Sequence, residues 1–270
     1  MTREQKLQTF RALHERAGLF IMPNPWNAGT ARILEALGFE ALATTSAGDA
    51  FMAGRRDGKL TRAETLANAK TIVEATVLPV SADLENGFGR SPEECAQTIR
   101  LAAEAGLAGG SIEDASGDPN DPIYDFELSV QRVAASAAAA RDCGFVLTAR
   151  AENFLHDRED LDDTIRRLRA YAQAGADVVY APALPDIQAV RTVCGVVSKP
   201  VNVLMGLTGP VYTVDELTAA GAKRITVGGS MARAALGAFE RAALEIKERG
   251  TFTYAADAMP HGTATAYMPE

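Results

Sequence analysis

Residues 77–89 read VLPVSADLENGFG, an apolar run that ends in two acids and a glycine-rich turn. The run that begins at Val77 predicts a buried strand. Asp83 and Glu85 are two positions apart, so on extended backbone both side chains point to the same side. Carboxylates in this position are costly to desolvate unless a cation meets them. A hard divalent cation with oxygen ligands is the simplest partner, and the stretch therefore predicts a metal site at the end of a strand.

The same pattern occurs twice more downstream. Residues 110–114 read GSIED, and residues 145–152 read FVLTARAE. Each is a short apolar run with charged side chains at its C-terminal end. Three consecutive strands that end in charge are difficult to explain by packing alone, and they favour one shared site at an edge of a sheet.

A second repeat predicts the fold class. Helical patterns end at a glycine and a β-branched run follows, as in residues 174–179 (AGADVV) and 220–227 (AGAKRITV). Amphipathic helices are expected at residues 61–76, 92–105 and 160–174. Alternation of helices with buried strands predicts parallel β structure with right-handed crossovers.

Eight strands are expected, near residues 20–22, 42–45, 78–82, 110–112, 146–149, 178–180, 201–204 and 225–227. Eight strands in 270 residues favour a single closed (β/α)8 barrel. No G-x-G-x-x-G follows the first strand, which disfavours a Rossmann domain. We expect one domain, residues 1–270, in which residues 251–270 form a tail without helical periodicity that packs on the surface or on a neighbour. The active site of such a barrel lies at the C-terminal ends of the strands, where the acids fall.

Composition excludes several classes of partner. The net charge of −8 argues against nucleic acid and anionic membrane surfaces, which attract basic patches. No apolar stretch approaches the ~20 residues of a membrane span, and the N-terminus has a polar helical pattern that is not typical of a signal peptide. Cys95, Cys143 and Cys194 are widely spaced among apolar residues, which is typical of reduced, buried thiols. We therefore expect a cytoplasmic protein with a small-molecule partner.

The candidate site residues each have a structural alternative. Asp83, Glu85 and Glu113 form the expected metal group, and capping or salt bridging at the loops is the alternative. Arg150 ends an apolar strand, so it presents a fixed cation to the barrel mouth that can hold a carboxylate or stabilise an enolate oxygen. A salt bridge from Arg150 to a neighbouring acid is compatible with that role.

Two loops complete the candidate site. Thr44 to Gly48 end the second strand, and hydroxyls and amides in a glycine-containing turn can bind an anion, although such segments are also ordinary turns. Residues 55–57, which end at Asp57, form a charged cluster for which a solvated face is an equal alternative. Residues 115–126 are rich in Gly, Pro, Asp and Asn and are long for a connection in a barrel, as lids often are.

Six segments together carry a family resemblance: residues 39–42 (FEAL), 54–57 (GRRD), 83–89 (DLENGFG), 112–114 (IED), 148–152 (TARAE) and 175–177 (GAD). Over nearly its full length the chain resembles the isocitrate lyase/phosphoenolpyruvate mutase superfamily. The resemblance implies a (β/α)8 barrel, Mg²⁺ with Mn²⁺ as the alternative, and a 2-oxo acid or dicarboxylate as substrate. It also implies a homo-oligomer, a tetramer or a dimer, in which the eighth helix is exchanged between neighbours.

Carried over position by position, the resemblance assigns roles to named residues. Asp57, Asp83, Glu85 and Glu113 surround the metal, with Asp83 in direct contact and the others often acting through water. Glu85 replaces the commoner aspartate, so its ligation stays open. Thr45, Ser46 and Ala47 bind the substrate carboxylate, and Arg150 contacts the substrate oxygens. The expected catalytic residues are thus Arg150, Asp57 and Glu113, and Asn120 and Tyr124 are added from the lid as substrate-binding residues.

Departures from the family leave the reaction open. The lid lacks the lysine, cysteine and histidine that the lyases carry, and Tyr180 stands where they have a glutamate. The leading hypothesis is C–C cleavage through an enolate, as in decarboxylation of oxaloacetate, which needs no lid acid when the bond breaks. One alternative is a lyase whose acid is Tyr124 or Tyr180. Two others are P–C bond chemistry on phosphonopyruvate (mutase or hydrolase) and a 2-oxo acid binding protein with little turnover.

Overall fold

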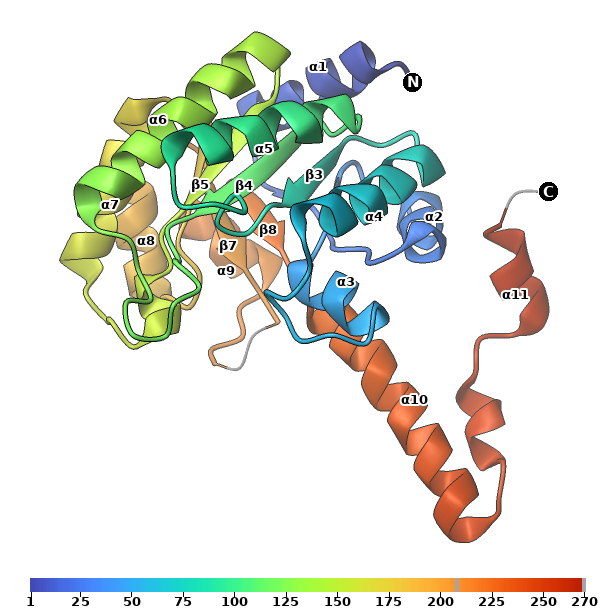
Figure 1. Cartoon of the computed structure of the whole chain (residues 1–270). Coiled ribbons are helices and arrows are strands. Elements are labelled where there is room, and N and C mark those ends of the chain that lie inside the picture. Colours follow the sequence, from blue (N-terminus) through green and yellow to red (C-terminus); the bar gives the residue numbers. More distant parts are fainter. Residues whose placement is uncertain (207–208, 269–270) are drawn as a thin grey trace.

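A computed structural model describes residues 1–206 and 209–268 of the chain. Eight parallel strands form one curled sheet in the order β1-β8-β7-β6-β5-β4-β3-β2 (Figure 1). The strands are β1 (Phe20–Ile21), β2 (Leu42–Ala43), β3 (Val80–Asp83), β4 (Gly109–Glu113), β5 (Val146–Arg150), β6 (Val178–Tyr180), β7 (Val201–Leu204) and β8 (Arg224–Thr226). All eight expected strands are confirmed, each within two residues of its expected bounds. The sheet and its helices are those of a (β/α)8 barrel.

Hydrogen bonds beyond the strand ladders join the two ends of the sheet. The Ala43 amide donates to the Pro23 carbonyl over 3.0 Å. Asn24, just after β1, donates its amide hydrogen to the Thr44 carbonyl at 2.8 Å, and its Oδ1 accepts from the Val227 amide at 2.8 Å. One buried asparagine thus ties the segments after β1, β2 and β8 together where the sheet closes on itself.

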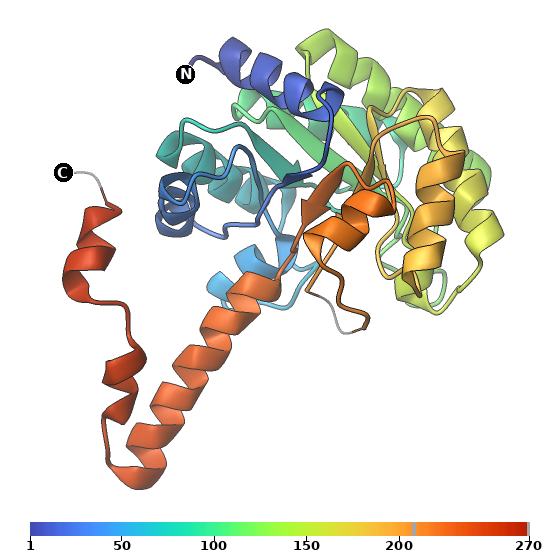
Figure 2. The ribbon, with the colours of Figure 1, turned by 180° about the vertical axis from the view of Figure 1, so that it is seen from behind.

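Helices cover the outside of the sheet (Figures 1 and 2). They are α1 (Arg3–Glu15), α2 (Ala28–Ala36), α3 (Ser46–Met52), α4 (Arg62–Ala75), α5 (Pro92–Glu104), α6 (Phe126–Cys143), α7 (Leu161–Ala174), α8 (Ile187–Val196), α9 (Val214–Ala219), α10 (Ser230–Arg249) and α11 (His261–Ala266), with short 3-10 helices η1 (Asn153–His156) and η2 (Thr253–Asp257). Capping boxes begin α4 at Thr61 and α5 at Ser91. Gly175, at φ 110°, ends α7 in the left-handed region that favours glycine.

Two apolar clusters fill the barrel and its shell. The larger one lies between strands and helices and includes Ile99, Leu147 and Leu168. The smaller one joins Phe10 and Leu13 of α1 to side chains from the N-terminal ends of the strands, such as Phe20, Val146 and Val178. Helix α1 therefore closes the N-terminal end of the barrel, which leaves the C-terminal end for the site.

The C-terminal region departs from the barrel. Helix α10 runs away from it, and the chain then turns back through η2 and α11 (Figures 1 and 2). Of α10, only Ala232 is buried, and Phe239 is 73% exposed. The sequence suggested no helical periodicity after residue 250, yet η2 and α11 are helical. Segments of five or six residues are too short to show a 3.6-residue repeat, which is why the pattern missed them. Within the described ranges, no helix is long and apolar enough to cross a membrane.

Candidate active site

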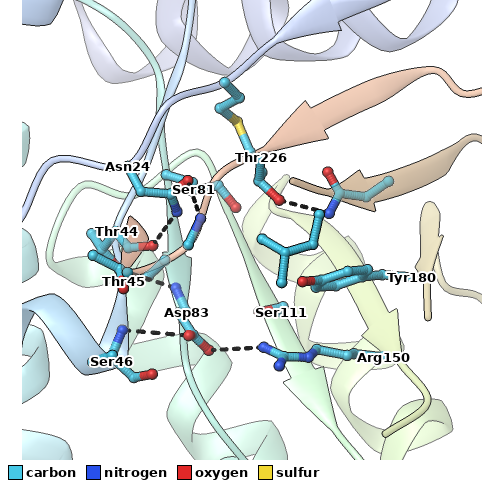
Figure 3. A pocket seen from close by; sticks show the side chains of 18 of the residues that line it. Asn24, Thr44, Thr45, Ser46, Ser81, Asp83, Ser111, Arg150, Tyr180 and Thr226 are labelled. Carbon is cyan, nitrogen blue, oxygen red and sulfur yellow. Dashed lines mark hydrogen bonds and ion pairs between the residues drawn. The ribbon is translucent and has the colours of Figure 1, made fainter. Parts of the chain in front are cut away.

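A cavity of about 190 Å³ lies at the C-terminal ends of the strands. Residues from β1, β2 and the loops that follow form one wall, with Asn24, Thr45 and Ser46 among them (Figure 3). Arg150 and Tyr180, from β5 and β6, face them across the cavity. The first sequence signal and the barrel geometry thus point to the same end of the molecule.

Arg150 is the fixed cation of this cavity. Its Nη1 lies 3.4 Å from Glu113 Oε2 and 3.9 Å from Asp83 Oδ1, and its Nε pairs with Glu152. Its Cζ lies 4.9 Å from the centroid of the Tyr180 ring. Burial opposes the charge, but Glu152, Tyr180 and Glu113 outweigh burial and raise the pKa of Arg150 well above its usual range. The guanidinium therefore stays charged. Its position is held by contacts with Asp83 of β3, Glu113 of β4 and Tyr180 of β6.

The acids around Arg150 carry more negative charge than it balances. Burial, followed by the charge of Glu152, raises the pKa of Glu113 well above its usual range. Burial and then Asp83 raise the pKa of Glu85 to about 7. The Asp57 carboxyl faces the cavity from an exposed loop. Burial, followed by the charge of Asp83, raises its pKa. These carboxylates crowd one another, and a further cation would relieve that repulsion.

Glu85 sits on unusual backbone. Its φ is 48°, in the left-handed region that residues with a side chain seldom adopt. The turn is held because the Glu113 amide donates to the Glu85 carbonyl at 3.0 Å and the Glu85 amide donates to Asp83 Oδ1 at 3.2 Å. Strained residues of this kind cluster at functional sites. The turn brings the third acid of the expected metal group beside the other two strand ends.

Magnesium fits this donor set only with water in its coordination shell. Among the described residues, no group of three or more His, Cys, Asp or Glu side chains is arranged to bind one ion directly. Mg²⁺ commonly takes one or two direct carboxylates and keeps several waters. This preference is met if Mg²⁺ binds Asp83 directly and binds Glu85, Glu113 and Asp57 through water. The cation would also offset the excess negative charge of these carboxylates.

The expected anion-binding turn lies across the cavity from Arg150. Thr45 caps α3, and its hydroxyl accepts from the Gly48 amide at 3.3 Å. The Ser46 amide lies 3.4 Å from Asp83 Oδ2, and the Asp83 amide donates to Thr44 Oγ1 at 3.0 Å (Figure 3). Thr45, Ser46 and Ala47 all line the cavity. The structure therefore brings this turn, Asp83 and Arg150 together.

The lid residues are placed elsewhere. A bridge between Ala115 and Ile123 folds the loop back on itself. Asn120 is exposed, and its amide donates to Asp118 Oδ1 at 2.9 Å. Tyr124 is 4% exposed, and the Cζ of Arg132 lies 4.3 Å from its ring centroid. Neither Asn120 nor Tyr124 lines the cavity, so in this conformation the structure does not bring the two expected lid residues to the site.

Tyr180 does line the cavity, and of the two tyrosines considered as acids it is the one at the site. Burial raises its pKa above the usual range, so the hydroxyl keeps its proton at neutral pH. Within the described chain the hydroxyl makes no hydrogen bond to protein. It is thus a proton donor available to a ligand.

A polar set inside the barrel was not among the residues expected from the sequence. Its members, all of which line the cavity, are Asn24, Asn202, Arg224 and Thr226. Asn202 Nδ2 donates to Thr226 Oγ1 at 2.9 Å, and Arg224 Nε donates to Asn202 Oδ1 at 2.8 Å. A signal was present, because Asn202 is a polar residue between Val201 and Val203 in a buried strand. Such a residue must find partners inside the barrel.

Comparisons with known proteins agree over most of the chain. A family model described as phosphoenolpyruvate phosphomutase matches residues 10–247. A candidate lyase/mutase from Burkholderia cenocepacia J2315 has a similar structure, with 55% identity, a TM-score of 0.96 and coverage of 98% of this chain and 96% of that one. The 2-methylisocitrate lyase of Halalkalibacterium halodurans is 31% identical and covers 90% of this chain and 82% of its own. A 2,3-dimethylmalate lyase structure has 25% identity and a TM-score of 0.86, and covers 99% of this chain and 94% of its own.

Proposed function

This chain belongs to the phosphoenolpyruvate phosphomutase family, and from that premise we propose that it is a carbon–carbon lyase. Its substrate in this proposal is a small 2-oxo acid or a related carboxylate, and the bond breaks through an enolate. The named lyases among its relatives support the class of reaction. Decarboxylation of oxaloacetate is the first reaction to test.

One observation carries the proposal. Arg150 faces the turn formed by Thr45, Ser46 and Ala47 (the Ser46 turn) across a single cavity, and Asp83 lies between them. A carboxylate at the turn would accept a hydrogen bond from the Ala47 amide in the first turn of α3, beside the Ser46 amide that lies 3.4 Å from Asp83 Oδ2. The adjacent 2-oxo oxygen would then lie on the side of Arg150. A fixed guanidinium in a partly dry site stabilises the charge that develops on that oxygen.

In decarboxylation, the bond between C3 and the departing carboxylate breaks, and its electron pair moves to the C2 oxygen as the enolate forms. Arg150 donates hydrogen bonds to that oxygen. The Ser46 turn holds the remaining carboxylate in place. C3 then takes a proton to complete the product, and Tyr180, which keeps its proton at neutral pH, is the candidate donor.

We further propose Mg²⁺, with Mn²⁺ as the alternative, held directly by Asp83 and through water by Glu85, Glu113 and Asp57. When bound, the cation would supply Lewis-acid stabilisation of the enolate oxygen. The raised pKa values of Glu85 and Glu113 support this proposal, since a cation would offset the repulsion that raises them.

Cleavage of a larger substrate with Tyr180 as general acid is the second candidate. It is favoured over the version with Tyr124 because only Tyr180 lines the cavity. Phosphonopyruvate chemistry and binding without turnover are the remaining alternatives. No lid side chain lines the cavity in this conformation to favour either one.

We also propose that the protein forms a tetramer, with a dimer as the alternative, by packing α10 on a neighbouring copy. The exposed apolar side chains of α10 include Met231, 40% exposed, and Leu244, 41% exposed. Helices such as α5 and α6 bury several residues each, whereas the 20 residues of α10 include one that is buried. The exposed apolar side chains of α10 are therefore suited to packing on another copy. A cytoplasmic location belongs to the same proposal, and the free thiols of Cys95, Cys143 and Cys194 support it.

The experiment that tests the function is a comparative assay of the purified protein with Mg²⁺. Oxaloacetate, phosphonopyruvate and methylisocitrate are supplied separately. The products followed are pyruvate with CO₂, phosphate or succinate, and phosphoenolpyruvate. Turnover of oxaloacetate to pyruvate and CO₂ supports decarboxylation. Release of succinate supports the lyase with Tyr180 as acid, and formation of phosphate or phosphoenolpyruvate from phosphonopyruvate contradicts both.

A further inference from the structure

Arg224 lies at the floor of the same cavity. It begins β8, and it is only 3% exposed although its side chain lines the cavity. Thr226 is two positions further along the strand, on the same face and nearer the mouth. Barrel interiors are ordinarily filled by bulky branched side chains. Here Ser81, Ser111 and Thr226 line the space instead, so the cavity reaches from the Ser46 turn down to Arg224.

Among the described residues, every hydrogen-bond partner of Arg224 is neutral. Its Nε donates to Asn202 Oδ1 at 2.8 Å, and its Nη2 donates to Thr148 Oγ1 at 3.0 Å. Its Nη1 lies 3.2 Å from His14 Nε2. The other ring nitrogen of His14 lies 2.8 Å from the Phe10 carbonyl, to which it must donate, so Nε2 accepts from Arg224 and the ring is uncharged. Burial, with the charge of Arg224, also lowers the pKa of His14 to about 3.

The guanidinium of Arg224 has no carboxylate within 4 Å of its nitrogens among the described residues. Arg150 and Arg167 differ in this respect, since Arg167 lies 3.1 Å from Asp114. Burial lowers the pKa of Arg224 to about 10, which leaves it charged at neutral pH. Arg132 is also buried without a carboxylate, but it donates to the carbonyls of Gly89, Arg90 and Asn86 and stacks on a ring.

Arg224 also has donors to spare. A guanidinium carries five N–H groups, and the three contacts above use three of them. One N–H on each terminal nitrogen remains, and two N–H groups of one guanidinium can together hold a carboxylate. A buried cation without a counter-charge is costly, and an anion in the cavity would remove that cost.

We propose that Arg224 is a second anion-binding point of the cavity, which takes the distal carboxylate of a dicarboxylic acid whose other end lies at the Ser46 turn. This inference rests on the proposed function and narrows its substrate class to dicarboxylates. Oxaloacetate meets the description. The test therefore uses saturated acids, which cannot react, so that binding is measured apart from turnover.

The test compares succinate with butyrate, which has the same number of carbons and lacks the second carboxylate. Calorimetry with Mg²⁺ present is expected to give at least tenfold tighter binding of succinate to the wild-type protein. In Arg224→Gln that preference should fall to about twofold or less, with butyrate affinity unchanged, and Arg224→Lys should keep part of it. A preference that survives in Arg224→Gln, or an equal loss of both ligands, overturns the proposal.

A second variant covers the case in which Arg224→Gln does not fold. Asn202→Asp places a carboxylate 2.8 Å from Arg224 Nε in the wild-type geometry and so supplies the missing counter-charge. We expect it to abolish the succinate preference and to raise the Tm of the ligand-free protein. An unchanged preference in this variant also overturns the proposal. Turnover without an Arg224-dependent preference contradicts only this inference, and a preference without turnover contradicts only the proposed function.

Discussion

The guanidinium of Arg150 lies over the ring of Tyr180, with 4.9 Å between Arg150 Cζ and the ring centroid. The two residues are opposite each other in the register of β5 and β6. The contact holds a tyrosine hydroxyl at the side of the cavity where the proposed enolate oxygen forms. The sequence offered Tyr124 and Tyr180 equally as the general acid. The structure favours Tyr180, because Tyr124 stacks on Arg132 away from the cavity.

The first prediction concerns those two tyrosines. Tyr180→Phe keeps the ring beneath Arg150 and removes only the hydroxyl, so it should lower kcat by ~10²–10⁴-fold if the hydroxyl is the proton donor. Tyr124→Phe is the matched control and should change kcat/KM by about tenfold or less, on the order of 1.4 kcal/mol. Steady-state kinetics on the substrate that the comparative assay identifies measure both.

Asn120→Ala extends that control to the exposed part of the lid and should also stay within about tenfold. A loss of roughly a thousandfold in Tyr124→Phe, with little change in Tyr180→Phe, would reverse the assignment. It would mean that the lid closes over the substrate and brings Tyr124 to the reacting bond.

Arg150→Gln should lower kcat by at least ~10²-fold, because it removes the positive charge placed to stabilise the enolate oxygen. Arg150→Lys should restore little, since an ammonium lacks the planar fork that meets Glu152 and Tyr180 together. Arg166→Gln is the control. Arg166 also lies over an aromatic ring, that of Phe126, at 4.1 Å, but outside the cavity. Equal effects of Arg150→Gln and Arg166→Gln would show that the loss is one of stability.

Asp83→Ala should abolish Mg²⁺-dependent activity and weaken Mg²⁺ binding measured by calorimetry, because it removes the proposed direct ligand. Chelation by EDTA should inactivate the wild-type protein, and added Mg²⁺ should restore it. Asp118→Asn, in the exposed part of the lid, is the control and should bind Mg²⁺ as the wild type does. Full activity in EDTA would remove the metal from the proposal.

His14 should contribute stability that is lost as the pH falls below about 6.5, while the raised pKa of Glu85 acts in the opposite direction. The pKa of His14 is about 3 in the folded protein, against about 6.5 in an unfolded chain. Between these values the unfolded chain binds the proton and the folded chain does not, so the free energy of unfolding rises with pH by up to about 1.4 kcal/mol per unit. Relative to neutral pH, this removes on the order of 2 kcal/mol at pH 5.

His14→Gln should remove that part of the pH dependence, since glutamine can accept from Arg224 and does not titrate. Urea unfolding at pH 7.5 and pH 5 measures it. His261→Gln, in the exposed tail, is the control and should keep the wild-type slope. An unchanged slope in His14→Gln would contradict the neutral state assigned to this ring.

Phe239→Asp should dissociate the expected oligomer, because the side chain is 73% exposed at the centre of α10 and a charge there opposes burial against another copy. Sedimentation at micromolar concentration should give a tetramer for the wild type and a smaller species for the variant. Glu240→Gln, a neighbouring exposed position on the same helix, should leave the assembly unchanged. A wild-type monomer would contradict the prediction.

The sequence by itself determined the strands, the class of barrel and the acids at the strand ends. These follow from local periodicity: apolar runs of a few residues become buried strands, and a glycine ends most of the helices before the next strand begins. Asp83, Glu113 and Arg150 are at strand ends, so the parallel sheet necessarily brings them to one face of the barrel. The Ser46 turn follows β2 directly and arrives there for the same reason.

Only the tertiary structure decided which other side chains meet the cavity. Tyr124 is drawn away from it by Arg132, which is on a helix, whereas Tyr180 is fixed by Arg150 on the next strand. Arg224 acquires its neutral surroundings from Thr148, Asn202 and His14, which are far apart in the chain. Contacts of this kind depend on packing between distant segments, and no local pattern encodes them. The physical reason is that burial and charge compensation are properties of the assembled barrel, whereas periodicity is a property of each segment.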